Sequence, residues 1–281
     1  MFELDNFELD NKVIAITGAG SGIGLALTRL CLARGARVAA CDIDPRALLE
    51  LQAQTDVLHV ATVDVGDRSA MAAWARAVEA HFGACDALVN NAGVSLSSRV
   101  QTMRREDLEW IMTINFWGVV NGVEAFLPLL LGRPEARIVN LSSLFGLIAV
   151  PSQSAYNASK FAVRGYSEAV RQDLRDTPVK VVTVHPGGVK TNIVRNGKHY
   201  DSLDGSATST EDTAEVFARI AGTTPEQAAL TILKGLCKGS PRVLVGRDAW
   251  WLDKIQRLLP AIYDRLLLPL SRRGQRRLAS G

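Results

Sequence analysis

The alternation of short apolar segments with helical patterns is the feature that most constrains the fold of this chain. The segments expected to form strands are 12–17, 37–41, 57–65, 87–90, 137–141, 180–184 and 242–245. The helical patterns between them cover 22–34, 45–54, 69–81, 104–131, 155–175 and 224–238. Strands that are apolar on both faces are typical of a sheet covered by helices on both sides. The right-handed crossover rule then predicts an α/β fold with a doubly wound parallel sheet, a Rossmann fold.

Composition excludes several classes of protein. The chain has 281 residues, 47% hydrophobic and 22% charged, which excludes intrinsic disorder. No apolar run reaches the roughly 18 residues that a membrane-spanning helix needs, and the acidic N-terminus has no secretory signal pattern. Four separated cysteines and four separated histidines show neither a disulfide framework nor metal-ligand spacing. We therefore expect a cytoplasmic protein without a metal site.

The distribution of charge separates the body of the chain from its C-terminus. No linker divides the body, so we expect one domain over residues 1–250 and an extension over 251–281. The extension carries seven basic and two acidic side chains, which more than accounts for the net charge of +3. A nucleic-acid enzyme would carry basic side chains on its body, so no nucleic-acid partner is predicted. The polar stretch 196–213 is expected to be a lid or a mobile loop.

A glycine-rich turn follows the first strand. It reads TGAGSGIG over residues 17–24 and connects that strand to the first helix. Such a turn lets a pyrophosphate approach backbone N–H groups at a helix N-terminus. Asp42 follows Gly22 by 20 residues, at the end of the second strand, where a carboxylate accepts hydrogen bonds from adenosine ribose hydroxyls. The two features together predict a dinucleotide-binding domain over residues 1–250.

Six further motifs occur in register with the strand order. They are Asn90-Asn91-Ala92-Gly93, Asn115, Ser143, Tyr156 with Lys160, Pro186-Gly187 and Thr191. With the glycine-rich turn, they resemble the short-chain dehydrogenases/reductases in their compact form, over about residues 10–250. The resemblance implies a catalytic Rossmann domain, and a homodimer or homotetramer assembled through the helices that contain Asn115 and Tyr156.

Tyr156 and Lys160 lie four residues apart, so on a helix they share one face. A free tyrosine has a pKa near 10, and an adjacent ammonium group favours its phenolate. The resemblance implies that Tyr156 takes the hydroxyl proton in alcohol oxidation or donates it in ketone reduction. It implies that Lys160 also holds the nicotinamide ribose and that Ser143 hydrogen-bonds the substrate oxygen. Asn115 would hold a water that links Lys160 to solvent.

The resemblance also assigns the residues that bind the cofactor, which carries the hydride. Ser21 and Ile43 stand where NADP-preferring members place a basic residue, and Asp42 repels a 2′-phosphate, so NAD is favoured over NADP. Asp64 has two interpretations, an adenine contact or a turn residue. The cofactor-binding residues implied are Gly18, Ser21, Gly22, Ile23, Gly24, Asp42, Asp64, Val65, Asn91, Ala92, Gly93, Tyr156, Lys160, Pro186, Gly187, Val189 and Thr191.

The segments beside the catalytic groups are mainly apolar and lack a pair of basic side chains that would clamp a carboxylate or phosphate. These segments are 94–96, 144–148, Val189 and 193–194. They favour a hydrophobic secondary alcohol or ketone, such as a steroid, a terpenoid, an aromatic or a long-chain compound. The alternative is that these apolar residues belong to the hydrophobic core and contact no substrate. We expect His199 and Tyr200 to lie in a solvated loop rather than against the substrate.

The extension repeats apolar side chains at helical spacing and ends in a basic run, 272–277. Pro260 is expected to break or restart the helix. One interpretation is an amphipathic helix that packs on its own subunit or a neighbour at the active-site mouth. A second is peripheral contact with an anionic membrane surface. A third, nucleic-acid binding, is disfavoured by the missing aromatic interleaving.

The sequence thus predicts an NAD-dependent oxidoreductase that transfers a hydride between nicotinamide and a hydrophobic secondary alcohol or ketone. Two alternatives are kept. One is an NADPH-dependent carbonyl reductase, which would have the same catalytic residues. The other is a non-catalytic protein that binds NAD or a membrane surface as a scaffold.

Overall fold

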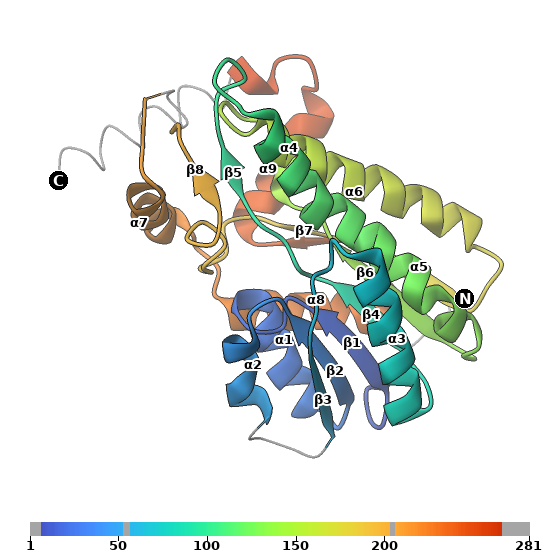
Figure 1. The fold of residues 1–281 in the computed structure, drawn as a ribbon. Coiled ribbons are helices and arrows are strands. Elements are labelled where there is room, and N and C mark those ends of the chain that lie inside the picture. The colour runs from blue at the N-terminus through green and yellow to red at the C-terminus, as the bar shows by residue number, and fades with distance from the viewer. Residues whose placement is uncertain (1–6, 53–56, 203–205, 266–281) are drawn as a thin grey trace.

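A computed structural model describes residues 7–52, 57–202 and 206–265 of the chain. Within them, seven parallel strands form one sheet in the order β3-β2-β1-β4-β6-β7-β9 (Figure 1). The strands are β1 (Val13–Thr17), β2 (Arg37–Asp42), β3 (Leu58–Thr62), β4 (Ala87–Asn90), β6 (Ala136–Leu141), β7 (Val179–Pro186) and β9 (Arg242–Val245). The strand order reverses between β1 and β4, which confirms the predicted doubly wound parallel sheet.

Helices cover both faces of the sheet (Figure 1). One face carries α1 (Gly22–Leu32), α2 (Pro45–Gln52) and α8 (Pro225–Lys238), and the other carries α3 (Arg68–Phe82), α5 (Gly118–Leu131) and α6 (Ser154–Asp173). Each face of the sheet has its own hydrophobic core, and successive residues of β1 point to opposite faces. Ile14 and Ile16 pack in the core beneath α1, α2 and α8, and Val13 and Ala15 pack in the core beneath α3, α5 and α6. Both faces of a strand are therefore buried, which explains the uninterrupted apolar segments in the sequence.

The long helix expected over 104–131 is interrupted by a π-helical turn. The run consists of α4 (Arg105–Met112), the π-helical turn Thr113–Trp117, and α5. Such turns occur frequently at functional sites, and this one contains Asn115. By length and composition, this run is the one helix among the described residues that could cross a membrane. Its side chains Ile111 and Phe126 are nevertheless fully buried in the protein, as in an ordinary core helix.

The described residues of the stretch 196–213, which are 196–202 and 206–213, form more regular structure than the sequence suggested. Within it, β8 (Lys198–His199) pairs with β5 (Leu96–Ser97), beyond the carboxyl ends of the main strands (Figure 1). A carboxylate oxygen of Asp201 accepts hydrogen bonds from the Arg99 backbone N–H (2.8 Å) and the Thr102 hydroxyl (3.2 Å). His199 is buried, so the expectation that it lies in a solvated loop is wrong. The helix α7 (Thr210–Ile220), which the sequence patterns did not predict, begins within this stretch.

The last described helix, α9 (Arg247–Leu258), begins four residues before the expected extension and ends before Pro260. Its buried residue Asp253 pairs with Arg242 at the end of the sheet. Tyr263, after the helix, accepts a hydrogen bond on its hydroxyl from the Ala149 backbone N–H (3.0 Å). This part of the extension therefore packs on its own domain, close to Ser143. The basic run 272–277 lies outside the described residues.

Candidate active site

A cavity of about 710 Å³ lies at the carboxyl ends of the central strands, where the strand order reverses. In doubly wound folds this crevice is where ligands bind. One end is lined by the glycine-rich turn, Asp42 and Asp64, and the other by the residues around Tyr156. The cavity therefore brings most of the predicted cofactor-binding residues together with Ser143, Tyr156 and Lys160 in one continuous space.

The glycine-rich turn packs against the end of β4 and is hydrogen-bonded to it. Gly18 and Gly22 have positive φ angles of 63° and 51°. A Cβ on Gly18 would lie 2.8 Å from the Ala92 Cα, too close for any side chain. The Asn91 side-chain amide donates to the carbonyls of Thr17 (2.9 Å) and Gly18 (3.0 Å). Glycine is required here for both the backbone conformation and the close approach of the chain.

Asp42 is fixed at the cavity wall. One carboxylate oxygen accepts a hydrogen bond from the Gly20 N–H (2.9 Å), and the other accepts one from the Asp44 N–H (3.2 Å). Asp44 also lines the cavity, and its carboxylate binds the Arg46 guanidinium at 3.2 and 3.3 Å. The hydrogen bond from Arg46 holds the pKa of the Asp44 carboxyl below its usual range. The guanidinium of Arg46, which does not itself line the cavity, is therefore paired with Asp44 in an exposed ion pair.

Most of the residues assigned to the cofactor line the cavity, and Gly24 is the exception. A Cβ on Gly24 would lie 2.0 Å from the Gly18 carbonyl oxygen, so this glycine allows α1 to pack against the turn. Asp64 both lines the cavity and closes a turn by accepting the Gly66 N–H (2.8 Å). The assigned residues that line the cavity are Gly18, Ser21, Gly22, Ile23, Asp42, Asp64, Val65, Asn91, Ala92, Gly93, Tyr156, Lys160, Pro186, Gly187, Val189 and Thr191.

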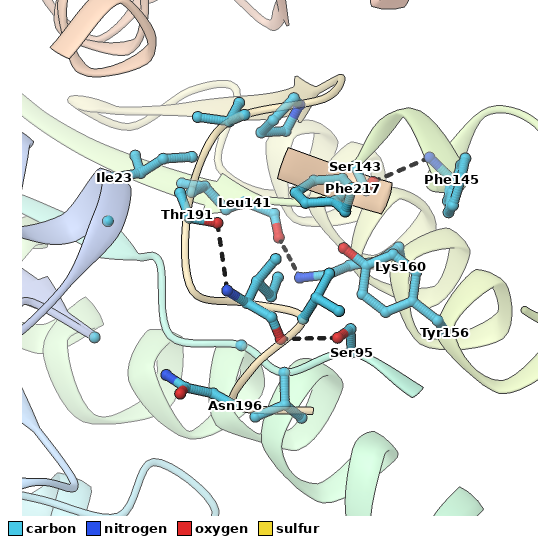
Figure 2. Close-up of a pocket in the computed structure, with 18 of the residues that line it drawn as sticks. Ile23, Ser95, Leu141, Ser143, Phe145, Tyr156, Lys160, Thr191, Asn196 and Phe217 are labelled. Carbon is cyan, nitrogen blue, oxygen red and sulfur yellow. Dashed lines mark hydrogen bonds between the residues drawn. The ribbon is translucent and has the colours of Figure 1, made fainter. Parts of the chain in front are cut away.

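Tyr156 and Lys160 project from α6 into the cavity, and both are buried, at 9% and 3% exposure. The Lys160 Nζ lies 5.8 Å from the centre of the Tyr156 ring and donates to the Leu141 carbonyl at 3.1 Å (Figure 2). Burial lowers the pKa of Lys160 to about 8. Burial also raises the pKa of Tyr156, and a hydrogen bond from the Ser143 side chain opposes that rise. The site therefore holds a phenol and an ammonium group away from bulk water.

Ser143 is positioned by the end of β6 and by β7. Its hydroxyl accepts a hydrogen bond from the Phe145 N–H at 3.1 Å (Figure 2). Its carbonyl lies 3.2 Å from the His185 Nδ1. Burial lowers the pKa of His185 to about 4, so the ring is neutral at neutral pH. A neutral ring that donates to the Ser143 carbonyl fixes the backbone of the serine, which leaves its hydroxyl beside the Tyr156 phenol.

Asn115 lies behind the cavity wall. Its side-chain oxygen accepts the Val94 N–H (2.8 Å), and its side-chain nitrogen donates to the Val94 carbonyl (3.0 Å) and the Ser159 hydroxyl (3.1 Å). A Cβ built on Gly93 would lie 3.1 Å from the Asn115 oxygen and 3.3 Å from the Lys160 Nζ. The absent side chain of Gly93 thus leaves a space that both polar groups reach. The water expected between Asn115 and Lys160 stays a prediction.

The wall beyond the catalytic residues comes from four parts of the chain. Seven of the expected residues line it: Val94, Ser95, Leu144, Phe145, Val189, Ile193 and Val194. Of the other expected residues, Leu147 and Ile148 pack against the C-terminal segment instead. Further lining residues lie outside the segments expected from the sequence. They include Ser97, Gln153, Asn196, Ser202, Thr208, Asp212, Thr213, Val216, Phe217, Ile220 and Asp248. The helix α7 could have been predicted from the sequence, because a capping serine precedes its recurring apolar residues. In the structure the Ser209 hydroxyl accepts the Asp212 N–H and caps the helix.

His199 and Ser95 add a polar contact to this wall. The His199 Nε2 lies 3.0 Å from the Ser95 hydroxyl oxygen. That hydroxyl donates to the Ile193 carbonyl at 2.8 Å (Figure 2). Burial lowers the pKa of His199 to about 4, so the ring is neutral at neutral pH. Because the serine proton points to Ile193, the ring donates through Nε2. The contact holds the segment after β7 against the segment after β4.

An ion-pair cluster anchors the same segment to α4. The Asp107 carboxylate is 1% exposed and accepts from the Arg104 Nε (2.8 Å) and the Lys198 Nζ (2.7 Å). Hydrogen bonds from Arg104 and Lys198 lower the pKa of Asp107 to about 2. Arg104 also donates to the Tyr200 hydroxyl (3.0 Å). The helix α4 leads into the π-helical turn that holds Asn115. The Asp107 cluster therefore links the segment that carries His199 to the helix that precedes Asn115.

Comparison with known proteins agrees with this geometry. The short chain dehydrogenase family model matches residues 12–201. The Putative oxidoreductase SadH of Mycobacterium tuberculosis is 44% identical over 265 residues, which cover 92% of this chain and 94% of that protein. Dehydrogenase/reductase SDR family member 7B of Mus musculus is 34% identical over 221 residues, which cover 74% of this chain and 68% of that protein.

Two solved structures show the same fold. A short chain dehydrogenase/reductase from Burkholderia phymatum in complex with NAD has a TM-score of 0.81 at 28% identity and covers 89% of this chain and 94% of its own. The closed form of a serine dehydrogenase complexed with NADP+ has a TM-score of 0.71 at 29% identity and covers 79% of this chain and 88% of its own. The chain belongs to the short-chain dehydrogenase family. It is an oxidoreductase that acts on CH–OH groups with NAD or NADP.

The residues present fit such a dinucleotide. The Ser21 side chain makes no capping hydrogen bond, so the first N–H groups of α1 have no side-chain partner beside the cavity. Unpaired N–H groups at a helix N-terminus suit a pyrophosphate. A Cβ on Gly22 would lie 2.9 Å from the Thr191 methyl group, so glycine lets the turn and the segment after β7 approach closely at the cavity wall.

Proposed function

We propose that this enzyme uses NAD to interconvert a hydrophobic secondary alcohol and its ketone, with Tyr156 exchanging the hydroxyl proton. One observation carries the proposal. The buried Tyr156 and Lys160 and the half-buried Ser143 lie where the carboxylate-lined end of the cavity meets its mainly apolar end. A carbinol held there would have its oxygen beside the phenol and its carbon toward the nicotinamide. The bound nicotinamide supplies or accepts the hydride.

The proposed roles follow from the positions of the side chains. Tyr156 would move the proton at its phenolic oxygen, and Ser143, which hydrogen-bonds to that phenol, would hold the substrate oxygen. The Lys160 ammonium, 5.8 Å from the ring centre, would favour the phenolate and bind the nicotinamide ribose. Asn115 would order a water beside Lys160, while its bonds to Val94 and Ser159 hold it in place.

The preference for NAD rests on charge at the adenosine end. Asp42 and Asp44 both line the cavity there, and the guanidinium of Arg46 is paired with Asp44. A 2′-phosphate in this place would face two carboxylates, and no Lys or Arg among the described residues lines this end of the cavity. The resulting repulsion would favour NAD, whose ribose hydroxyls can instead donate to Asp42.

The substrate class rests on charge at the other end. Among the described residues that line the cavity, Lys160 is the one Lys or Arg. The wall near Tyr156 is built largely from apolar groups, including Phe145, Val194 and Phe217. A carboxylate or phosphate on the substrate would find no partner there, whereas an apolar body would be covered. Steroid, terpenoid, aromatic and long-chain alcohols all fit this description.

The test of the cofactor preference is steady-state kinetics with NAD and NADP. Asp42→Ala should lower the ratio of kcat/KM for NAD to that for NADP by about tenfold or more, because one nearby charge is worth at least about 1.4 kcal/mol. Asp176→Ala, which removes an exposed carboxylate outside the cavity, should leave the ratio unchanged. An unchanged ratio in Asp42→Ala would contradict the role given to this carboxylate.

We also propose that the enzyme is a homodimer assembled through the α5–α6 side, with the homotetramer as the alternative. Trp117, just before α5, and Phe161 on α6 are large apolar side chains exposed at 52% and 40%. Exposed apolar groups on one side favour association. Light scattering should give the mass of a dimer for the wild type and a lower mass for Phe161→Lys. A monomeric wild type would exclude this assembly.

A further inference from the structure

The C-terminal end of the described chain presents a group of exposed apolar side chains. We call it the α9 patch: Trp250, Trp251, Leu258, Leu259 and Ile262, all of them exposed. The two tryptophan rings contact edge to face, with centroids 4.7 Å apart. Leu258 is 77% exposed, the most of any large apolar side chain among the described residues. Exposed groups of this size gathered in one place indicate an interaction surface.

The opposite side of α9 is fixed to the domain. Ala249 and Asp253 are buried, and Leu252 packs against the cluster formed by Leu144, Leu147 and Ile148. Trp250 and Trp251 therefore cannot turn inward without breaking the Asp253 ion pairs. Because the helix orientation is held by these contacts, the patch faces solvent as a stable feature of the fold.

Basic side chains surround the patch. Arg247, Lys254 and Arg257 are exposed on the same helix, and the Lys254 Nζ lies 5.8 Å from the centre of the Trp250 ring. The acidic neighbours are mostly engaged elsewhere. Asp253 is buried between Arg242 and Arg257, and Asp248 accepts the Gly188 N–H at 2.7 Å. Asp264 remains exposed, with a hydrogen bond from the Arg265 N–H.

We propose that the α9 patch docks on an anionic lipid surface. Tryptophan rings prefer the level of the lipid headgroups, and basic side chains next to them attract anionic lipids. Apolar contact and charge attraction act together here, and stable surface binding generally needs two such contributions. The sequence beyond residue 265 continues both features, with four leucines between 266 and 270 and four arginines between 272 and 277.

The patch lies close to the cavity. Asp248, in the first turn of α9, lines the cavity, and Leu252 packs against Leu144, which follows Ser143. Docking would therefore bring the cavity toward the bilayer, where an apolar alcohol partitions. This last step rests on the proposed function. The docking itself does not, because it depends on the α9 patch and the basic side chains around it.

The experiment is co-sedimentation of the full chain with phosphatidylcholine vesicles that contain or lack phosphatidylserine. We expect binding to the anionic vesicles that falls as salt is raised. Leu258→Glu should weaken it by about tenfold. Val100→Glu is the matched control, since Val100 is 74% exposed and lies between β5 and α4. It should bind as the wild type does.

A second variant, Trp250→Ala with Trp251→Ala, should weaken binding as well, and far-ultraviolet circular dichroism checks that it folds. Absence of binding by the wild type at low salt, or equal loss in the Leu258 and Val100 variants, would overturn the proposal. A third outcome would also overturn it: the wild type does not bind vesicles, and its dimer dissociates when the two tryptophans are replaced. The patch would then be an interface between two copies of the chain. Neither substrate nor cofactor is present, so these outcomes do not depend on the reaction.

Discussion

The buried carboxylate of Asp107 gives a quantitative test of how the cavity is held together. It receives hydrogen bonds from Arg104 on one side and Lys198 on the other, and so joins α4 to the segment that carries His199. Asp107→Asn keeps the shape of the side chain and removes its charge. Both cations then lose their shared partner, and they can turn toward solvent because they are already partly exposed.

The expected loss follows from the pKa of the carboxyl. Its ordinary value of 3.8 is lowered to about 2 in the folded protein. Each unit corresponds to about 1.4 kcal/mol, so the charged form contributes about 2 kcal/mol to the free energy of unfolding at neutral pH. Because the folded pKa is depressed, this contribution is complete above about pH 5 and is lost as the pH falls through about 2. The difference between wild type and Asp107→Asn should shrink over the same range.

The assay is urea unfolding of wild type, Asp107→Asn and Glu109→Gln, followed by tryptophan fluorescence near neutral pH and at about pH 3. Glu109 is the matched control on the same helix, where it forms an exposed pair with Arg105 that should contribute under about 0.5 kcal/mol. Equal losses in the two variants, or a difference that does not change with pH, would refute the reasoning. The KM for substrate should rise in Asp107→Asn, with NAD affinity unchanged.

Three further predictions concern the cavity. Lys160→Met should move the rising limb of the pH–rate profile for alcohol oxidation upward by about 2 pH units, since a charge at this separation favours the phenolate by roughly 3 kcal/mol; an unmoved profile would speak against the role of the ammonium group. Gly20→Ala should weaken NAD binding in calorimetry, because the new Cβ would lie 2.9 Å from an Asp42 carboxylate oxygen; wild-type affinity would show that the turn adapts. Phe217→Ala should raise KM severalfold for large apolar alcohols and leave small ones unaffected; an equal change for both would place Phe217 outside the substrate contact.

The features of the fold that depend on local pattern could be predicted from the sequence. Continuous apolar strands follow from burial on both faces, and the turn after β1 needs glycine because Gly18 approaches Ala92. The spacing of Tyr156 and Lys160 on one helix placed both on one face, and the structure points both into the cavity. In each case the physical cause lies within a few residues of the chain or in a regular repeat.

The features that sequence patterns could not give depend on contacts between distant segments. The pairing of β5 with β8 joins residues about 100 positions apart, and it buries His199 in a stretch whose composition resembles a loop. The Asp107 cluster arises from the same long-range contact. Gly24 shows the opposite case, because a motif position assigned to the cofactor serves the packing of α1 on the turn.

The most direct test of the proposed function is NADH formation by the purified full chain, with NAD and a panel of apolar secondary alcohols, for wild type and Tyr156→Phe. The phenylalanine keeps the buried ring and removes the hydroxyl, so folding and NAD binding should be unchanged. Turnover by the wild type should fall about a thousandfold in the variant, within the usual range for loss of an acid–base group. A variant that keeps the wild-type rate would contradict the assignment of proton transfer to Tyr156.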